Sequence, residues 1–410
     1  MKKKVDVQNL KIGMYVCELD RPWLESSFLF QGFFVQSKEQ LEAVQQECDH
    51  VIVDTLRVPD LPANSLLALP STPGVITSLL RAKGAKRYPR QVTIEDELKS
   101  ARIARSQTRK FIDNVFADVQ SGRIPDLKEV RETVANMVES IVRNPDAQLC
   151  LAQLKNRDEY TAQHSVNVCV LTITFGRHLG LSVRQLNLAG MGGLLHDIGK
   201  LRTPLEILNK PGKLTDEEFA IMRAHPDHGR EILEANPGIP AAVIDVAFTH
   251  HERLHGHGYP RGLKADEISL WSKMVAIVDV YDAITSNRIY HDGMNATEAL
   301  TRMYEWRERD FDPVLLEQFT QCIGIYPIGT LVELHGGEVG IVISTNPELR
   351  LRPKVLVVLD EEKRPYYPTR VVDLAQFVDR EEGIYAINKA LEPGTYNVDV
   401  QQHIRQLHVR

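Results

Sequence analysis

The spacing of apolar and polar positions divides the chain into parts with different periods. In residues 94–120 and 127–142, apolar residues return every three or four positions, which predicts two amphipathic helices. Nearly every ordered stretch from residue 126 to about 321 has the same helical period. Two helix starts are also readable there, because Ser182 and Thr215 begin segments with the residues of N-terminal caps. This section therefore predicts an all-helical domain.

Short extended patterns occur at both ends of the chain. After Gly324, apolar runs flank a turn at Gly336 and Gly337, which predicts a hairpin and a third strand. A stretch rich in proline, serine and alanine, with a basic cluster, is typical of a linker. We therefore expect a mainly α protein with these parts: a small α/β N-terminal domain (1–58), a linker (59–92), connecting helices (93–147), a helical bundle (148–321), and a small β-rich C-terminal appendage and tail (322–410).

Composition narrows the class of protein. The 410 residues are 43% apolar and 25% charged, which is ordinary for a globular chain. The net charge of −6 gives no general attraction for a nucleic-acid polymer, so none is expected as a partner. No apolar run approaches the roughly 20 residues that span a bilayer, and no hydrophobic stretch follows the basic start, so we expect a cytoplasmic location. Five scattered cysteines indicate neither a disulfide framework nor a thiolate zinc site.

Histidines are concentrated in the helical section. Of the fourteen histidines, ten lie between His164 and His291. A single histidine on an apolar helix face is more often a hydrogen-bonded core residue than a ligand, but this concentration favours a metal site. In "LLHDIGK", a His-Asp pair follows an apolar run, where buried polar groups need a partner. Pro226 predicts that the helix starting after Thr215 ends at His225.

Helical register directs several of these side chains inward. His164 shares a face with Val168 and Phe175, and Asp279 is flanked by apolar residues. Imidazole and carboxylate ligands without thiolate suit Fe, Mn, Zn, Co or Ni. Seven inward candidates are too many for one tetrahedral site and suit two metals that share a carboxylate: His164, His196, Asp197, His225, His250, His251 and Asp279.

The same region resembles a known family. The motifs "HDIGK", "LNKPGKLTDEEF", "MRAH", "HHE", "GYP" and "VDVYDAITSNRIY", between about Leu149 and Phe319, are similar to those of HD-GYP domains. These domains are a branch of the HD phosphohydrolases that degrades cyclic di-GMP. The N-terminal segments "LKIGMYV", "LDRPW" and "FLFQGFF" resemble an uncharacterised domain often joined to HD-GYP modules. The resemblance implies an HD-type helical bundle and hydrolysis of cyclic di-GMP to linear pGpG, with GMP left open as a further product.

The resemblance also implies a role for each matching position. One metal would be held by His164, His196, Asp197 and Asp279, and the other by Asp197, His225, His250 and His251. Two divalent ions are expected, Fe or Mn first, with Zn, Ni or Co open, because Tyr160 stands where some relatives carry a glutamate for a third metal. Asp197 and Lys200 are the expected catalytic residues, and Lys200 would contact the reacting phosphate. The expected substrate contacts are Lys200, Gly258, Tyr259, Pro260 and Arg288, together with Asp282, which lies either behind the metal ligands or beside a guanine base.

Two segments depart from the family pattern. His255 and His257 stand in the loop before "GYP", and His291 replaces the usual basic residue after Arg288-Ile289-Tyr290. These changes spare the metal ligands and affect the substrate loop. They leave open a catalytically weak receptor of cyclic di-GMP that acts through a partner, such as a diguanylate cyclase or another signalling protein. Hydrolysis of a nucleoside triphosphate or an alarmone is a third alternative, against which "GYP" argues, and homodimer formation is also left open.

Overall fold

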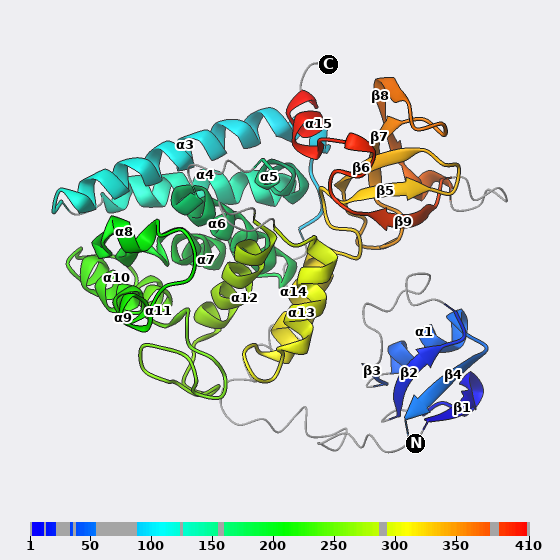
Figure 1. Ribbon diagram of the computed structural model, residues 1–410, viewed down its shortest axis with the longest axis horizontal. Coiled ribbons are helices and arrows are strands. Elements are labelled where there is room, and N and C mark those ends of the chain that lie inside the picture. The colour runs from blue at the N-terminus through cyan, green and yellow to red at the C-terminus, as the bar shows by residue number, and fades with distance from the viewer. Residues whose placement is uncertain are drawn as a thin grey trace. The chain divides into compact units, whose positions relative to one another are not determined.

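Two compact units make up the protein, Met1–Val75 and Ile76–Arg410. The structure, a computed structural model (Figure 1), describes the following residues: 2–11, 14–21, 33–35, 38–54, 88–123, 126–154, 160–286, 293–377 and 385–407. Most of the predicted linker lies outside the described residues.

The N-terminal unit is a small antiparallel sheet with one helix. Its strands lie in the order β1-β4-β2-β3. Valines at alternate positions, such as Val51 and Val53 on β4, are buried and form a cluster with Val16 and with Val44 of the helix. The predicted α/β character is confirmed, and most of "FLFQGFF" lies outside the described residues. The elements are β1 (Lys2–Asp6), β2 (Tyr15–Leu19), β3 (Phe33–Phe34), α1 (Lys38–Glu47) and β4 (His50–Asp54).

The second unit begins with a helical bundle. Its longer helices are α3 (Ile94–Gln120), α4 (Leu127–Arg143), α5 (Pro145–Ala152), α6 (Tyr160–His178), α7 (Val183–Leu195), α10 (His225–Glu234), α11 (Ala241–Thr249), α12 (Leu270–Thr285), α13 (Ala296–Glu305) and α14 (Pro313–Ile323). Shorter pieces are η5 (Ile198–Arg202), α8 (Leu205–Leu208) and α9 (Asp216–Met222). The mainly helical class predicted from the sequence is confirmed.

Helix α6 is central to this bundle. It contacts α3, α4, α5, α7, α12 and α14, and Figure 1 shows these helices around it. Its side chains from Val166 to Phe175 are nearly all buried, because its sequence is apolar on several faces. The two predicted caps are confirmed, since Ser182 and Thr215 each form a capping box at the start of α7 and α9. A polar residue on α6, such as His164, is therefore inside the bundle.

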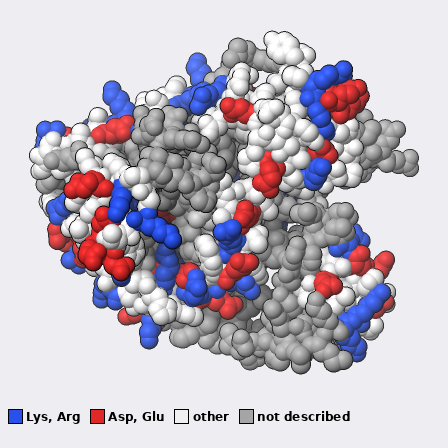
Figure 2. All heavy atoms as spheres, viewed as in Figure 1, with Lys and Arg blue, Asp and Glu red and all other residues white. Residues whose placement is uncertain are grey.

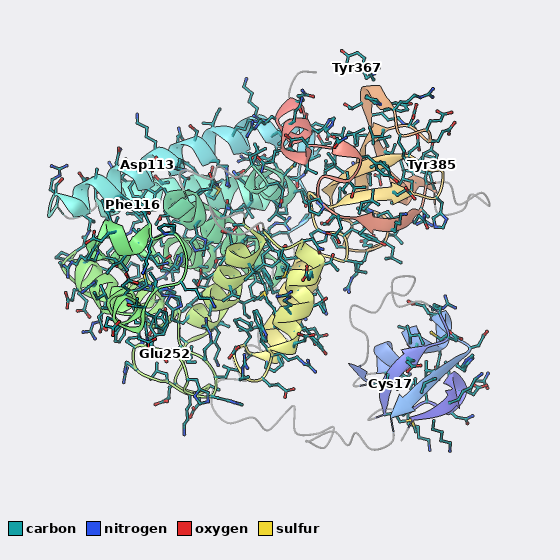
Figure 3. All side chains as sticks on the ribbon, viewed as in Figure 1. Cys17, Asp113, Phe116, Glu252, Tyr367 and Tyr385 are labelled. Atoms are coloured by element: carbon teal, nitrogen blue, oxygen red, sulfur yellow. The ribbon has the colours of Figure 1, made fainter. Side chains whose placement is uncertain are left out.

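The C-terminal part is an antiparallel sheet of five strands in the order β8-β7-β6-β5-β9. The predicted hairpin is confirmed as β5 and β6 around Gly337, and β7 is the third strand. The strands are β5 (Leu331–Leu334), β6 (Val339–Ser344), β7 (Lys354–Leu359), β8 (Pro365–Asp373) and β9 (Ile387–Leu391), and a last helix, α15 (Val400–Gln406), follows. On β8, Tyr367 is 95% exposed and projects from the sheet (Figure 3).

The sheet and the bundle share one hydrophobic core. Ile341 and Ile343 of β6 belong to the same buried cluster as the residues of α3 to α7. A polar junction lies beside this core, where the buried Asp146 carboxylate accepts a hydrogen bond from Ser344 at 2.5 Å and pairs with Arg90 at 2.7 Å. The C-terminal sheet is therefore an integral part of the second unit.

The distribution of charge and the apolarity of the helices describe the surface of the bundle. On the face in Figure 2, basic and acidic side chains of the helical bundle are mixed. Among the described residues, no helix combines the length and apolarity needed to cross a membrane.

Candidate metal centre

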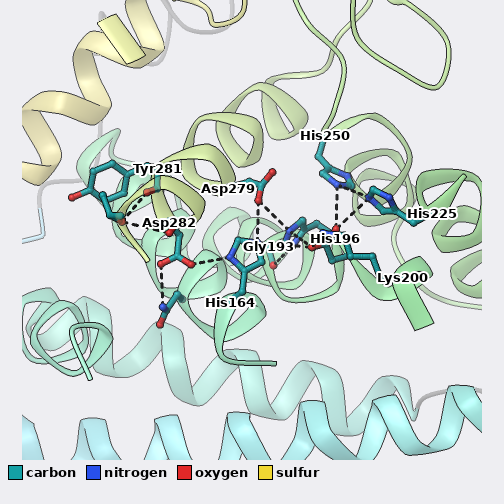
Figure 4. A network of polar contacts seen from close by, with 12 residues as sticks. His164, Gly193, His196, Lys200, His225, His250, Asp279, Tyr281 and Asp282 are labelled. Carbon is teal, nitrogen blue, oxygen red and sulfur yellow. Dashed lines mark hydrogen bonds and ion pairs between the residues drawn. The ribbon is translucent and has the colours of Figure 1, made fainter. Parts of the chain in front are cut away.

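Five segments of the bundle deliver the predicted metal ligands to one place (Figure 4). His164 comes from α6, the His196-Asp197 pair from the end of α7, and Asp279 from α12. His225 is the first residue of α10, and His250 and His251 follow the end of α11. The prediction that His225 ends the preceding helix was wrong. That helix stops at Met222, and Pro226 is accepted in the first turn of a new one, where proline has no hydrogen bond to lose.

One group of ligand atoms surrounds one oxygen of Asp197. The group contains Asp197, His225, His250 and His251, and one atom from each lies within 4.8 Å of the others. The Nε2 atoms of His225 and His250 are 3.3 and 3.5 Å from Asp197 Oδ1. These two nitrogens are 3.4 Å apart. Such spacing leaves room for one cation among inward-facing donors.

A second group surrounds the other oxygen of the same carboxylate. His164, His196 and Asp197 also have ligand atoms within 4.8 Å of one another. Asp197 Oδ2 is 3.3 Å from His196 Nε2 and 3.8 Å from His164 Nε2. Asp279 Oδ1 completes the group, at 3.0 Å from His164 Nε2 and 3.7 Å from His196 Nε2. Asp197 therefore lies between two groups of donors, as a carboxylate that bridges two metals must.

Hydrogen bonds on the far side of each ring turn its Nε2 atom toward the ligand groups. His196, His225 and His250 donate from Nδ1 to backbone carbonyls three or four residues earlier, at 2.7–3.1 Å. His164 donates from Nδ1 to Asp282 Oδ2 at 2.8 Å. Because a neutral imidazole has one N–H, these bonds place the Nε2 lone pair toward the ligand groups.

Buried atoms without partners indicate that the centre is built for cations. Among the described residues, His196 Nε2 and Asp197 Oδ1 are buried and have no hydrogen-bond partner. His196 is 0% and Asp197 1% exposed, so water cannot satisfy them from bulk solvent. A buried lone pair and a buried carboxylate oxygen are costly when unpaired, and a divalent cation would satisfy both. The residues present therefore fit divalent metal ions.

Protonation differs between the two groups. Burial lowers the pKa of His250 to about 4 and holds the pKa of His251 well below its usual value, so both rings are neutral near pH 7. Burial also acts on His196, but the Asp197 and Asp279 carboxylates outweigh it and raise the pKa of His196 to about 10. A cation that binds His196 must therefore displace a proton.

A glycine brings the lysine of "HDIGK" to the centre. A Cβ atom on Gly199 would lie 1.9 Å from the carbonyl oxygen of His225 and 2.4 Å from the nitrogen of Gly229, so only glycine permits this contact between η5 and α10. The next residue, Lys200, has its Nζ atom 2.5 Å from Asp197 Oδ2. Its side chain is 23% exposed. Lys200 is thus partly open to solvent, and Figure 4 shows it beside His196.

The "GYP" segment packs on the histidines. Tyr259 stacks on His251, with ring centroids 4.6 Å apart, and the Arg223 guanidinium lies 4.8 Å from the Tyr259 ring centroid. A Cβ on Gly258 would come within 2.4 Å of the Glu252 backbone, so this position also requires glycine. Gly258, Tyr259 and Pro260, which are the predicted substrate residues of this loop, therefore lie beside a predicted metal ligand.

Glu252 is a residue to which the sequence analysis gave no role. Its carboxylate is buried and accepts hydrogen bonds from the backbone N–H groups of Arg261 and Leu263 at 2.8 and 2.9 Å. Figure 3 shows it in the bundle. It closes the loop that contains the "GYP" residues. Its place directly after His251 in "HHE" was the available signal, but the partners of the carboxylate are nine and eleven residues away.

The remaining predicted residues are placed differently. Asp282 is 2% exposed, and its two oxygens face His164 and the Asn167 side chain, at 2.8 and 3.0 Å. Its carboxylate therefore contacts a predicted metal ligand and not solvent. His255 and His257 are exposed. Arg288 and His291 lie outside the described residues.

Comparisons with known proteins agree with these observations. Family models match an HD domain over residues 148–315, a domain of unknown function (DUF3391) over 2–130, and a KOW domain associated with HD domains over 331–398. The chain is 39% identical over 378 residues to a cyclic di-GMP phosphodiesterase of Pseudomonas aeruginosa, which covers 92% of this chain and 90% of the relative.

Two further matches cover less or are more distant. A 3′3′-cGAMP-specific phosphodiesterase of Vibrio cholerae is 42% identical over 147 residues, which are 36% of this chain and 34% of the relative. A solved structure of an HDG"Y"P protein from Bdellovibrio bacteriovorus is 17% identical with a TM-score of 0.46, covering 78% of this chain and 98% of that one.

The bundle and its histidine-aspartate centre define an HD-domain protein. The match to the P. aeruginosa relative extends over nearly the whole of both chains. The chain belongs to the HD-GYP family and is a phosphodiesterase, as its motifs predicted.

Proposed function

We propose that this enzyme hydrolyses cyclic di-GMP to linear pGpG, with GMP as a further product, in bacterial second-messenger signalling. The observation that carries the proposal is the position of Asp197 between two groups of imidazole and carboxylate ligand atoms. The relative that matches over 92% of the chain is named a cyclic di-GMP phosphodiesterase, which supports this substrate.

We assign one divalent ion to each ligand group. His164, His196, Asp197 and Asp279 would hold one ion, and Asp197, His225, His250 and His251 would hold the other. Fe or Mn are the first candidates, and Zn, Ni and Co suit the same ligands. When bound, a pair of divalent cations supplies an activated water nucleophile near neutral pH and offsets negative charge on the phosphate.

Side chains of the protein would contact the phosphate, orient a metal ligand and line the substrate site. Lys200 is partly exposed beside Asp197, so its ammonium group would contact a non-bridging phosphate oxygen, where negative charge grows in the transition state. Asp282 would hold the His164 ring with Nε2 toward the metal. The loop of Gly258, Tyr259 and Pro260, closed by Glu252, would form one wall of the substrate site, and Arg288 would contact a second phosphate.

A second candidate function is a cyclic di-GMP receptor with weak catalysis. It is favoured by His255 and His257, which are exposed in the loop before Gly258. Both residues lie outside the ligand groups, so they would alter substrate placement and leave metal binding intact.

The test is turnover by the metal-loaded, purified chain. We would incubate the protein anaerobically with Fe or Mn and cyclic di-GMP and follow pGpG and GMP by chromatography, with 3′3′-cGAMP and an alarmone as competing substrates. The control is a His196→Ala, Asp197→Ala variant whose helical circular dichroism matches that of the unmodified protein. Turnover of cyclic di-GMP confined to the unmodified protein is expected. Binding without turnover would establish the receptor, and faster hydrolysis of a competitor would change the substrate.

A further inference from the structure

A cavity of about 200 Å³ lies between α3, α5 and α6. Three arginines of α3, Arg102, Arg105 and Arg109, line one side of it, at the spacing that places side chains on one face of a helix. Gln163 of α6 and apolar side chains of α5 and α6 line the other side. We call it the arginine cavity. None of the residues that line it belongs to the two ligand groups.

The positive charges of Arg102 and Arg105 in the arginine cavity are incompletely paired. Arg109 forms an ion pair with Asp113 at 3.0 Å. Arg102 donates to the backbone carbonyls of Ile404 and Arg405, both in α15. No acidic side chain among the described residues forms an ion pair with Arg102 or Arg105. In the same part of the chain, Arg102 Nε and Arg105 Nη1 are buried without a hydrogen-bond partner. A partly buried guanidinium charge without a carboxylate partner is costly, and an anion in the cavity would neutralise it through the donors that face the cavity.

Arg105 is also connected to the metal centre. Its Nη2 atom donates to Asn167 Oδ1 at 2.5 Å, and Gln163 Nε2 donates to the same oxygen at 3.1 Å. Asn167 Nδ2 then donates to Asp282 Oδ1 at 3.0 Å. The other oxygen of Asp282 accepts from His164 Nδ1. Four side chains thus connect the cavity with a predicted metal ligand through continuous hydrogen bonds.

We propose that the arginine cavity binds a small phosphate-bearing anion, which strengthens metal binding at His164 through Arg105, Asn167 and Asp282. Guanidinium groups match phosphate oxygens in geometry and charge. The volume is below the roughly 300–1,000 Å³ of sites for larger ligands, so it suits inorganic phosphate or the phosphate group of a phosphomonoester such as GMP better than a whole cyclic dinucleotide. The anion would offset the charge of Arg105, leaving the Asp282 carboxylate a stronger partner for His164. Only this second effect rests on the proposed metal centre.

The first experiment measures anion binding by calorimetry on the full, metal-loaded chain. Inorganic phosphate and GMP are titrated into the unmodified protein, an Arg102→Gln, Arg109→Gln variant, Arg109→Gln alone and a His196→Ala variant. Arg123→Gln is the matched control, because Arg123 pairs with Asp118 as Arg109 does with Asp113. We expect the double variant to bind phosphate at least tenfold more weakly, Arg109→Gln several-fold more weakly, and Arg123→Gln and His196→Ala to retain this site.

The titration identifies the source of the phosphate group and the location of the site that binds it. Tighter binding of GMP than of phosphate identifies a nucleotide as the source of the phosphate group, and equal or weaker binding identifies free phosphate. Binding that is lost in His196→Ala but unchanged in both cavity variants belongs to the metal centre and overturns the proposal. Thermal unfolding of each variant shows whether it is folded. If the double variant is unfolded, Arg109→Gln, which changes a single side chain, still tests the proposal.

The second experiment tests the connection to the metal. Metal affinity is measured by competition with a chelator, with and without phosphate. We expect phosphate to raise the affinity several-fold in the unmodified protein and to have no effect in the double cavity variant. Asn167→Leu should bind phosphate normally and lose the effect on the metal. An effect that persists in Asn167→Leu would overturn the connection, and failure of metal binding altogether would overturn the proposed centre while leaving the anion result intact.

Discussion

The partner of each imidazole Nδ1 atom decides which nitrogen can bind a metal. Three of the ligand histidines use backbone carbonyls, whereas His164 uses the carboxylate of Asp282. A carboxylate partner makes an imidazole a stronger ligand than a carbonyl does, because its negative charge stabilises the N–H group and raises the basicity of the opposite nitrogen. His164 is therefore the ligand whose strength depends most on a second side chain.

We predict that Asp282→Asn weakens metal binding about 10- to 100-fold, the usual cost of losing such a partner. The amide can still accept the hydrogen bond from His164, so the fold should survive. Metal affinity by chelator competition is the measurement, and Asp118→Asn, at an exposed ion pair, is the control. Equal affinity in Asp282→Asn and in the unmodified protein would contradict the role assigned to the carboxylate.

The raised pKa of His196 gives a second prediction at this scale. In the folded protein without metal, the pKa of His196 is about 10, which is above the ordinary histidine value of 6.5 that applies in the unfolded chain. The ring therefore stabilises the metal-free protein fully below pH 6.5, and this contribution is lost as the pH rises toward 10. The metal competes with the same proton, so its affinity rises over that window. The gap in melting temperature between metal-loaded and chelator-treated protein should widen from pH 6.5 to 10, measured by thermal unfolding. A gap that narrows would contradict the prediction.

Close contact between two elements positions the centre. The turn η5 lies against the start of α10, and the contact is possible because Gly199 has no side chain. This packing puts the residues on either side of Gly199, Asp197 and Lys200 among them, next to His225. The packing of η5 on the start of α10 thus positions residues of both ligand groups.

We predict opposite outcomes for two neighbouring glycine substitutions. Gly199→Ala would push a methyl group into the His225 carbonyl, so it should cost about 1–3 kcal/mol or more in the free energy of unfolding and reduce metal content. Gly229→Ala, on the opposite side of the same contact, meets its nearest atom at an ordinary 3.5 Å. It should be tolerated, and its helix preference adds up to about 1 kcal/mol of stability. Denaturant unfolding and metal analysis of both variants provide the measurement, and similar results for the two would refute the contact.

The elements that sequence patterns predicted are those with strong local signals. The helix over 94–120 has the predicted bounds because its amphipathic period and the Thr93 cap agree. The start of α10 was missed because proline after His225 can end one helix or begin another, and only packing decides. Likewise, motifs indicated the ligand residues, but the hydrogen bond from His164 to Asp282 joins side chains 118 positions apart, which no local pattern contains.

At the scale of the whole molecule, the separate hydrophobic cores indicate which parts of the chain can fold alone. The buried cluster of the second unit runs from Ile94 to Ile404 and includes both bundle and sheet. The N-terminal unit has a cluster of its own, and among the described residues the two share no member.

We predict that residues 76–410 alone keep the melting temperature and metal content of the full chain. A chain that ends at Gly324 should lose both, because it exposes several apolar residues of the shared core, each worth about 1.5–3 kcal/mol, against a typical total stability of about 5–15 kcal/mol. Thermal unfolding by circular dichroism and metal analysis compare the two fragments. A stable, metal-binding fragment without the sheet would show that the sheet is an independent domain.

The separate N-terminal cluster has a consequence for how such chains evolve. Genetic recombination within the segment between the two clusters would exchange the first unit without cutting through either core. The five-stranded sheet cannot be exchanged so freely, because a replacement must fit the side chains of β6 against the helices of the bundle. Inheritance should therefore keep bundle and sheet together in one lineage, while new leading domains are acquired.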